Sequence, residues 1–284
     1  GMKMALGENP KRVYGGRKKS PATRMGNAAV LREALVKAQE YVVAWARYED
    51  ELAAYSSDGS QAIPAGAQVP VRAQAHDEGQ AKAARQQNGN GTKLPKPPSR
   101  DLKMEALAKV VTREMKARIH VHQANDILTA IRIAEEFDLD ITLEHVTAGH
   151  QVAEVIAAKE IPVTVGPIFS GRSKYELRAK HHKNPGVLSR AGVKVAIQTD
   201  AASAVQYLAI NAALAAREGM PEDEAFKAIT LNAAEIIGVA DRVGSLEDGK
   251  DADVAVFSAH PFEYRAVAEM VFVNGVCEYR REEA

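Results

Sequence analysis

The strongest constraint on the fold is a regular alternation of apolar strands and helical segments after residue 101. Strands that alternate with helices of this kind indicate a parallel sheet joined by right-handed crossovers. The apolar composition of the strands predicts that both faces of the sheet are buried. We expect strands at 118–122, 141–145, 161–167 and 193–200, each followed by a helix, at 126–137, 151–159, 173–181 and 203–218. The pattern therefore predicts an α/β fold.

Three of these strands end on metal-ligating side chains: His120 and His122 on one, His145 on the next, and Asp200 on the last. In a βα barrel the carboxyl ends of the strands form the catalytic face. Residues two apart on a strand point the same way, so His120 and His122 can reach one site. Imidazole and carboxylate together suit a divalent ion such as zinc. The spacing predicts a metal site, and the alternative is a set of hydrogen-bonded structural histidines.

The first hundred residues have a different organisation. A short strand is expected at 1–6, a loop rich in Gly and Pro at 7–16, and a long amphipathic helix at 23–55. Residues 56–100 are rich in Ala, Gln, Gly, Asn and Pro without a sustained period, so we interpret them as an insertion or flexible connection. His76 falls inside it and is assigned to the surface. A second amphipathic helix is expected at 101–115.

The last part of the chain changes period again. Two further helices are expected at 221–230 and 232–237, and short strands at 253–257, 270–274 and 276–279. Asn274–Gly275 between the last two strands is a strong hairpin signal. The tail is therefore expected to form a small antiparallel unit.

Composition limits the class of partner. The 284 residues carry 37 basic and 37 acidic side chains, so nothing favours nucleic acid as a partner. No run of about 18 apolar residues exists, and we expect no membrane span. The lone Cys277 excludes an internal disulfide framework and a Cys-rich zinc site, and it fits a reducing cytoplasm. A cytoplasmic protein is therefore the expectation.

At this point the residues resemble a known family. Gly244–Phe257 and Val271–Gly275 resemble the C-terminal signature of the amidohydrolase superfamily. The segments at 120–127, 143–150 and 197–200 are similar to the metal-ligand strands of its imidazolonepropionase-like and Xaa-Pro-dipeptidase-like branch. The resemblance implies a metal-dependent-hydrolase (β/α)8 TIM barrel with a small β-sandwich. It also implies one or two divalent metals, zinc in the first place, that activate a hydrolytic water.

The resemblance assigns roles residue by residue. His120 and His145 match metal ligands on the fifth and sixth barrel strands. Asp200 matches the aspartate that ends the eighth strand, binds metal and takes the proton of the attacking water. Lys3 matches, more weakly, the fourth-strand lysine that is carbamylated in binuclear members.

Two further residues are candidates for the substrate side. His122 is expected to orient His120 or to contact substrate. Arg172, in the loop after the seventh strand, can hold a substrate carboxylate by a bidentate pair, and a surface arginine is the equally open alternative.

One feature of the family has no counterpart. The HisXaaHis of the first barrel strand is missing, so we expect residues 1–243 to form about strands four to eight of the barrel. Residues 244–284 would form the C-terminal strands of the small β domain. The expected activity is hydrolysis of C–N bonds in small amides, cyclic amides or dipeptides, with the missing strands supplied by a partner or a homo-oligomer. The alternatives are a truncated, catalytically inactive fragment and, less favoured, a binding module with a degenerate barrel.

Overall fold

The computed structural model describes residues 1–57 and 94–282, and it divides the chain into two compact units. The larger unit comprises residues 1–30 and 115–284, and the smaller one residues 31–114. Most of the insertion predicted at 56–100, including His76, lies outside the described residues.

The larger unit is built on a five-stranded parallel sheet in the order β1-β2-β3-β4-β5. Its strands are β1 (Met2–Ala5), β2 (Ala117–Val121), β3 (Ile141–His145), β4 (Val163–Val165) and β5 (Val195–Ile197). Consecutive strands are neighbours, so each crossover advances the sheet by one strand. The sheet confirms the predicted α/β class and its parallel arrangement.

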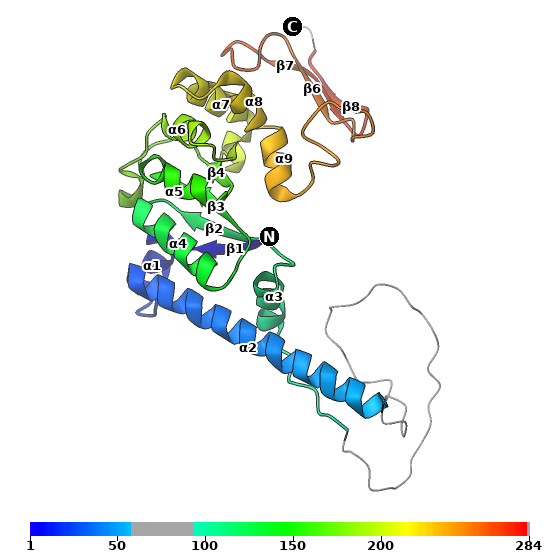
Figure 1. Ribbon diagram of the computed structural model, residues 1–284. Helices are drawn as coiled ribbons and strands as arrows, with labels where there is room; N and C mark the ends of the chain where they lie inside the picture. Colours follow the sequence, from blue (N-terminus) through cyan, green and yellow to red (C-terminus); the bar gives the residue numbers. More distant parts are fainter. Residues whose placement is uncertain (58–93, 283–284) are drawn as a thin grey trace. The chain divides into compact units, whose positions relative to one another are not determined.

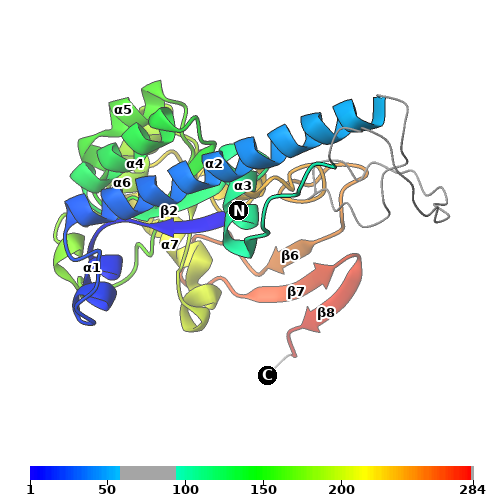
Figure 2. The same ribbon diagram turned by 90° about the horizontal axis from the view of Figure 1, so that it is seen from below.

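The predicted helices correspond to α4 (Ala124–Glu136), α5 (Ala153–Ala158), α7 (Leu208–Arg217), α8 (Glu222–Lys227) and α9 (Leu231–Ile237). A further helix, α6 (Asn184–Arg190), lies between β4 and β5 and was not predicted. Figures 1 and 2 show α4, α5 and α6 along one face of the sheet. The strand residues Ile119 and Leu143 and the helix residues Ile127, Ile156 and Leu188 are fully buried. Burial of such side chains contributes about 1.5–3 kcal/mol each.

Two local predictions are wrong. The expected loop at 7–16 contains the helix α1 (Glu8–Gly15). Pro10 falls in its first turn, where a missing N–H is harmless, and Glu8 favours the positive end of the helix dipole. The helix expected at 173–181 is only one 3₁₀ turn, Tyr175–Leu177, because this segment folds against distant side chains that are described below.

The tail forms a three-stranded antiparallel sheet of β6 (Val254–Phe257), β7 (Ala268–Val273) and β8 (Val276–Arg280). Asn274 and Gly275 join the last two strands with φ values of 51° and 79°. Two positive φ values are typical of the hairpin turn that an Asn-Gly pair favours, and the predicted hairpin is confirmed. The proposed boundary at residue 243 stays a prediction.

The smaller unit holds most of α2 (Arg24–Ser57) together with α3 (Leu102–Val111), which confirms both predicted helices. Trp45, Tyr48 and Leu52 form its buried cluster. Asp101 caps α3 by accepting hydrogen bonds from the amides of Lys103 and Met104. Among the described helices, none combines the length and the apolar run needed to cross a bilayer.

Candidate metal centre

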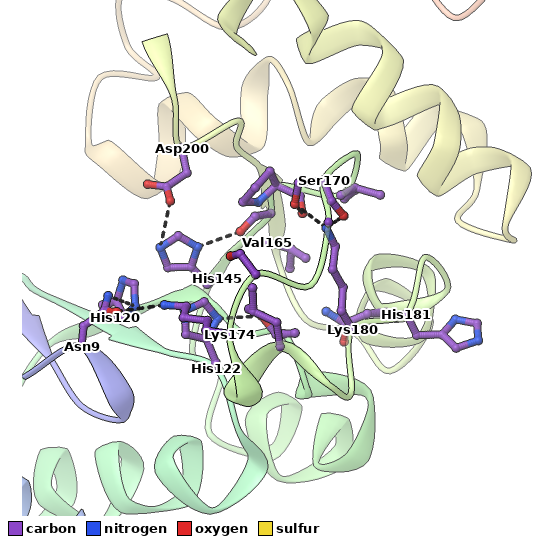
Figure 3. A pocket seen from close by; sticks show the side chains of 18 of the residues that line it. Asn9, His120, His122, His145, Val165, Ser170, Lys174, Lys180, His181 and Asp200 are labelled. Carbon is purple, nitrogen blue, oxygen red and sulfur yellow. Dashed lines mark hydrogen bonds and ion pairs between the residues drawn. The ribbon is translucent and has the colours of Figure 1, made fainter. Parts of the chain in front are cut away.

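A cavity of about 590 Å³ opens at the carboxyl ends of the parallel strands. The structure brings four predicted site residues together in its wall: His120, His122, His145 and Asp200. They come from β2, from the end of β3 and from the segment after β5. Figure 3 shows Asp200 facing the His145 ring across the cavity. The meeting of these side chains follows from the parallel sheet, because its carboxyl ends share one edge.

The strand β2 and a strained turn after β3 direct the three imidazoles into one place. His120 lies in β2 and His122 directly follows the strand, and side chains two residues apart on extended backbone point to the same side. His145 lies beside Val121 in the strand register, one position out of step with His120. The backbone turns left-handed at His145 (φ 70°) and at the fully buried Val146 (φ 45°), and this turn brings the imidazole into the cavity. A left-handed β-branched residue is strained, and such strain is common at functional sites.

The three rings pack against one another. The ring centroids of His120 and His145 are 4.2 Å apart, and His122 lies 4.7 Å and 4.8 Å from them. Burial lowers the pKa of His120 to about 3 and that of His122 to about 2, because a buried imidazolium is poorly solvated. Burial also lowers the pKa of His145. The rings are therefore neutral near pH 7, the form in which histidine binds metal.

Hydrogen bonds orient two of these rings. His145 Nδ1 lies 2.7 Å from the Gly166 carbonyl oxygen, which can only accept, so the proton is on Nδ1 and the Nε2 lone pair is free. That lone pair lies 3.9 Å from Asp200 Oδ2. A zinc ion bound to both atoms, with bonds of about 2.0–2.2 Å, would fit this separation with a wide nitrogen–zinc–oxygen angle. His122 Nδ1 is held by the Thr147 hydroxyl at 2.7 Å. This donor set fits a divalent ion, with a second group orienting each of these two rings.

A buried network that we did not predict lies beside the histidines. Glu176 is fully buried, and its Oε1 lies 2.7 Å from the Lys174 ammonium. Its Oε2 accepts a hydrogen bond from the Glu8 amide at 2.7 Å. Lys174 Nζ also donates to Asn9 Oδ1 at 3.0 Å, so the Asn9 amide nitrogen donates to His120 Nε2 at 3.1 Å. This network joins the loop after β4 to α1 and to β2.

Sequence reasoning missed Glu176, Lys174 and Asn9 for identifiable reasons. Asn9 lay in a predicted loop, and the other two lay in a segment expected to form a polar helix. The available signal was a pair of charges in a loop at the carboxyl end of a parallel strand, where ligand-binding residues gather.

Two groupings of side chains are candidates for holding an ion. One is the predicted set of His120, His145 and Asp200. The other is a tighter cluster of His120, His122 and Glu176, whose ligand atoms lie within 4.8 Å of one another. The Lys174 ammonium is already paired with Glu176 in the second grouping and would repel a metal there. The first grouping is therefore the better place for a resident metal.

The two remaining predicted site residues, Lys3 and Arg172, are not among the residues that line the cavity. Lys3 is exposed on β1 beside Arg118, and its charge contributes to the lowered pKa values of His120 and His145. Arg172 is exposed, and its guanidinium donates to the Lys180 carbonyl oxygen at 2.7 Å. The cations that line the cavity are Arg12, Lys174 and Lys180. The roles of Lys3 and Arg172 stay predictions.

Comparison with known proteins identifies the family of the chain. The sequence matches the amidohydrolase family over residues 67–277, which is most of the chain. The chain belongs to the amidohydrolase family. The resemblance drawn from the C-terminal signature and the ligand strands is thereby confirmed.

Individual relatives add detail. The amidohydrolase tasK of Hapsidospora irregularis is 25% identical over 98% of this chain and 25% of its own length. An imidazolonepropionase of Solibacter usitatus is 29% identical over 59% of this chain and 41% of its own. The crystal structure of an amidohydrolase from Thermotoga maritima matches with a TM-score of 0.78 and 38% identity, over 98% of this chain and 62% of that one. The chain thus spans less than two thirds of each of these relatives.

Proposed function

We propose that this chain carries the metal centre of a hydrolase that cleaves C–N bonds in small amides, cyclic amides or dipeptides. The observation that carries the proposal is the neutral His145 ring, whose Nε2 lies 3.9 Å from Asp200 Oδ2 and whose centroid lies 4.2 Å from that of His120 in the same cavity wall. Family membership supports the reaction class. Zinc suits this mixture of imidazole and carboxylate ligands.

In this proposal the chain supplies ligands and a base. His120, His145 and Asp200 would hold a divalent ion, which supplies a Lewis acid and lowers the pKa of a bound water to about 7. The Asp200 side chain is 55% exposed, so it can take a proton from water and pass it to the leaving nitrogen. Gly166 holds the His145 ring in the required tautomer throughout. The cavity volume lies within the range of about 300–1,000 Å³ typical of small-molecule sites.

The substrate side of the cavity is positively charged. Lys180 Nζ donates to the Ser170 carbonyl oxygen at 2.7 Å, and burial, followed by the Arg172 charge, lowers the pKa of Lys180 to about 8. Arg12 lines the same cavity. These cations favour a substrate with an anionic group. We retain His122 and Arg172 as candidate substrate contacts and the cytoplasm as the expected compartment.

We also propose that the parallel sheet is part of a barrel. Its strands follow one another in sequence order, as in a TIM barrel, and β1 and β5 are the outer strands of the described sheet. Further strands beyond β1 and β5 would close it. The small antiparallel sheet would then belong to the accompanying β domain.

A substrate panel tests the function. Purified protein with one equivalent of zinc is assayed for amine release from small amides, cyclic imidazolones and dipeptides, with and without a chelator. We expect chelator-sensitive turnover that Asp200→Asn lowers at least about 100-fold. Asp223→Asn, which changes an exposed carboxylate on α8, is the control and should leave the rate unchanged. Zinc binding without turnover on any substrate would favour the catalytically inactive alternative.

A further inference from the structure

The Lys174 ammonium contacts a carboxylate oxygen of Glu176 and the amide oxygen of Asn9, and an imidazole nitrogen of His122 lies close to the same carboxylate oxygen. Glu176 Oε1 lies 2.7 Å and Asn9 Oδ1 3.0 Å from Lys174 Nζ. His122 Nε2 lies 3.4 Å from the same Glu176 oxygen. His122 Nε2 is buried, and it has no hydrogen-bond partner among the described residues. A carboxylate, an amide oxygen and an imidazole nitrogen around one point make a cation-binding cluster.

The spacing of the cluster suits both an ammonium group and a metal ion. Lys174 Nζ lies 2.7 Å from Glu176 Oε1 and 3.0 Å from Asn9 Oδ1, which are ordinary ammonium contacts. His122 Nε2 and Glu176 Oε1 are 3.4 Å apart. Zinc bonds of about 2.1 Å place two ligand atoms about 3.4 Å apart at a tetrahedral angle. These two atoms are therefore already spaced for a divalent ion, although the cation in contact with the carboxylate is the lysine.

Charge explains why a cation is needed there. Glu176 is fully buried, and an ionised carboxylate without a partner is strongly disfavoured in a protein interior. Lys174 is the cation in contact with it, since Arg24 in the neighbouring network pairs with Asp126. The Lys174 side chain is 18% exposed, so the cluster can be reached from the cavity that it lines.

We propose that Lys174 is a built-in cation that occupies a second metal position. This inference rests on the proposed function. The native site then holds one metal ion at His120, His145 and Asp200, and the Lys174 ammonium takes the place of a second metal ion. Glu176, Asn9 and His122 form a latent site that becomes available to a divalent ion when the ammonium is removed. Lys174 is thus a positioning residue that determines metal number.

Metal stoichiometry tests the inference. Zinc per chain is measured by equilibrium dialysis and elemental analysis for the wild type, Lys174→Met, Lys174→Met with Glu176→Gln, and Lys180→Met as the matched lysine control. We expect one zinc in the wild type and in the control, two in Lys174→Met, and one again in the double variant. Zinc should also raise the melting temperature of Lys174→Met more than that of the wild type.

The inference is overturned if Lys174→Met binds no more zinc than the wild type, as when Glu176 takes up a proton instead. It is equally overturned if the extra zinc persists in the double variant. Should the wild type bind none while Lys174→Met binds one that the double variant loses, this inference stands and the proposed function falls. Circular dichroism on each variant verifies that it is folded.

Discussion

The two ends of the parallel sheet differ in how they use polar residues. At the amino ends, Lys116 and Asp140 form a pair at 2.8 Å whose side chains are each about one third exposed. At the carboxyl ends, Glu176 and the histidines are buried. Residues with left-handed backbone occur at both ends of the sheet. At the amino ends, Asp138 and Glu160 are exposed and follow the ends of helices α4 and α5. A left-handed residue is a common way to end a helix. His145 and Val146 adopt this conformation while buried after a strand, without such a reason.

This contrast indicates that the polar residues at the amino ends serve stability, whereas those at the carboxyl ends serve chemistry. Exposed pairs such as Lys116–Asp140 contribute little and are easily replaced. Buried charge and strained backbone cost free energy, and they persist where the surrounding structure and a function require them. The carboxyl ends carry both, which agrees with the position of active sites in βα folds.

The largest effect is expected from breaking the buried pair at the carboxyl ends. Glu176→Ala leaves the Lys174 ammonium without its partner and should lower the free energy of unfolding by about 3–5 kcal/mol. Replacing both residues, by Glu176→Gln with Lys174→Met, should cost less than either single change, because no charge is left alone. Urea unfolding of metal-free protein followed by circular dichroism measures these values. Equal costs for Glu176→Ala and Lys116→Ala would remove the contrast between the two ends.

A smaller effect is expected from pH. In the folded protein the pKa values of His120, His122 and His145 are lowered, whereas in the unfolded chain they return to about 6.5. Below that pH the unfolded state binds more protons, so stability is lost as the pH falls from 6.5 towards 3. Between pH 6.5 and 5.5, His120 and His122 should each cost about 1 kcal/mol, and the lowered pKa of His145 adds to the loss in the same direction.

Urea unfolding of metal-free protein at the two pH values measures this loss. His122→Asn should reduce the loss by about 1 kcal/mol, since the contribution of this buried ring is removed. The exposed His181→Gln is the matched control and should leave the loss unchanged. A loss that is the same in His122→Asn and in the wild type would contradict the neutral state of the buried rings.

The smallest effect is expected at the amino ends. Lys116→Ala removes a partly exposed ion pair with Asp140 and should lower the free energy of unfolding by about 0.5 kcal/mol, with no change in zinc content. The same unfolding and dialysis experiments check both values. A loss of more than about 2 kcal/mol in the free energy of unfolding would show that the amino ends also contain an ion-pair network on which stability depends.

The sequence was most informative where local pattern decides structure. The strand at 141–145 was predicted with its observed bounds, and the hairpin at Asn274–Gly275 follows from turn chemistry alone. The site residues His120, His145 and Asp200 could be placed together because parallel strands end at one edge. Their roles as ligands stay predictions.

Other features depend on contacts between distant segments. Glu176 and Glu8 are 168 residues apart, and each carboxylate accepts a hydrogen bond from the other residue's amide. Such a contact has no periodic signature, so the turn at Tyr175–Leu177 was taken for a helix. The left-handed turn at His145 and Val146 also has no signal in the sequence, because a β-branched valine rarely adopts this conformation.

The most direct test of the account is zinc per chain in wild type, Asp200→Ala and Glu176→Gln, measured by elemental analysis after dialysis against buffer with a defined free zinc concentration. The account predicts one zinc in the wild type, loss of that zinc in Asp200→Ala, and its retention in Glu176→Gln. Retention in Asp200→Ala together with loss in Glu176→Gln would place the metal among His120, His122 and Glu176, and would contradict the account.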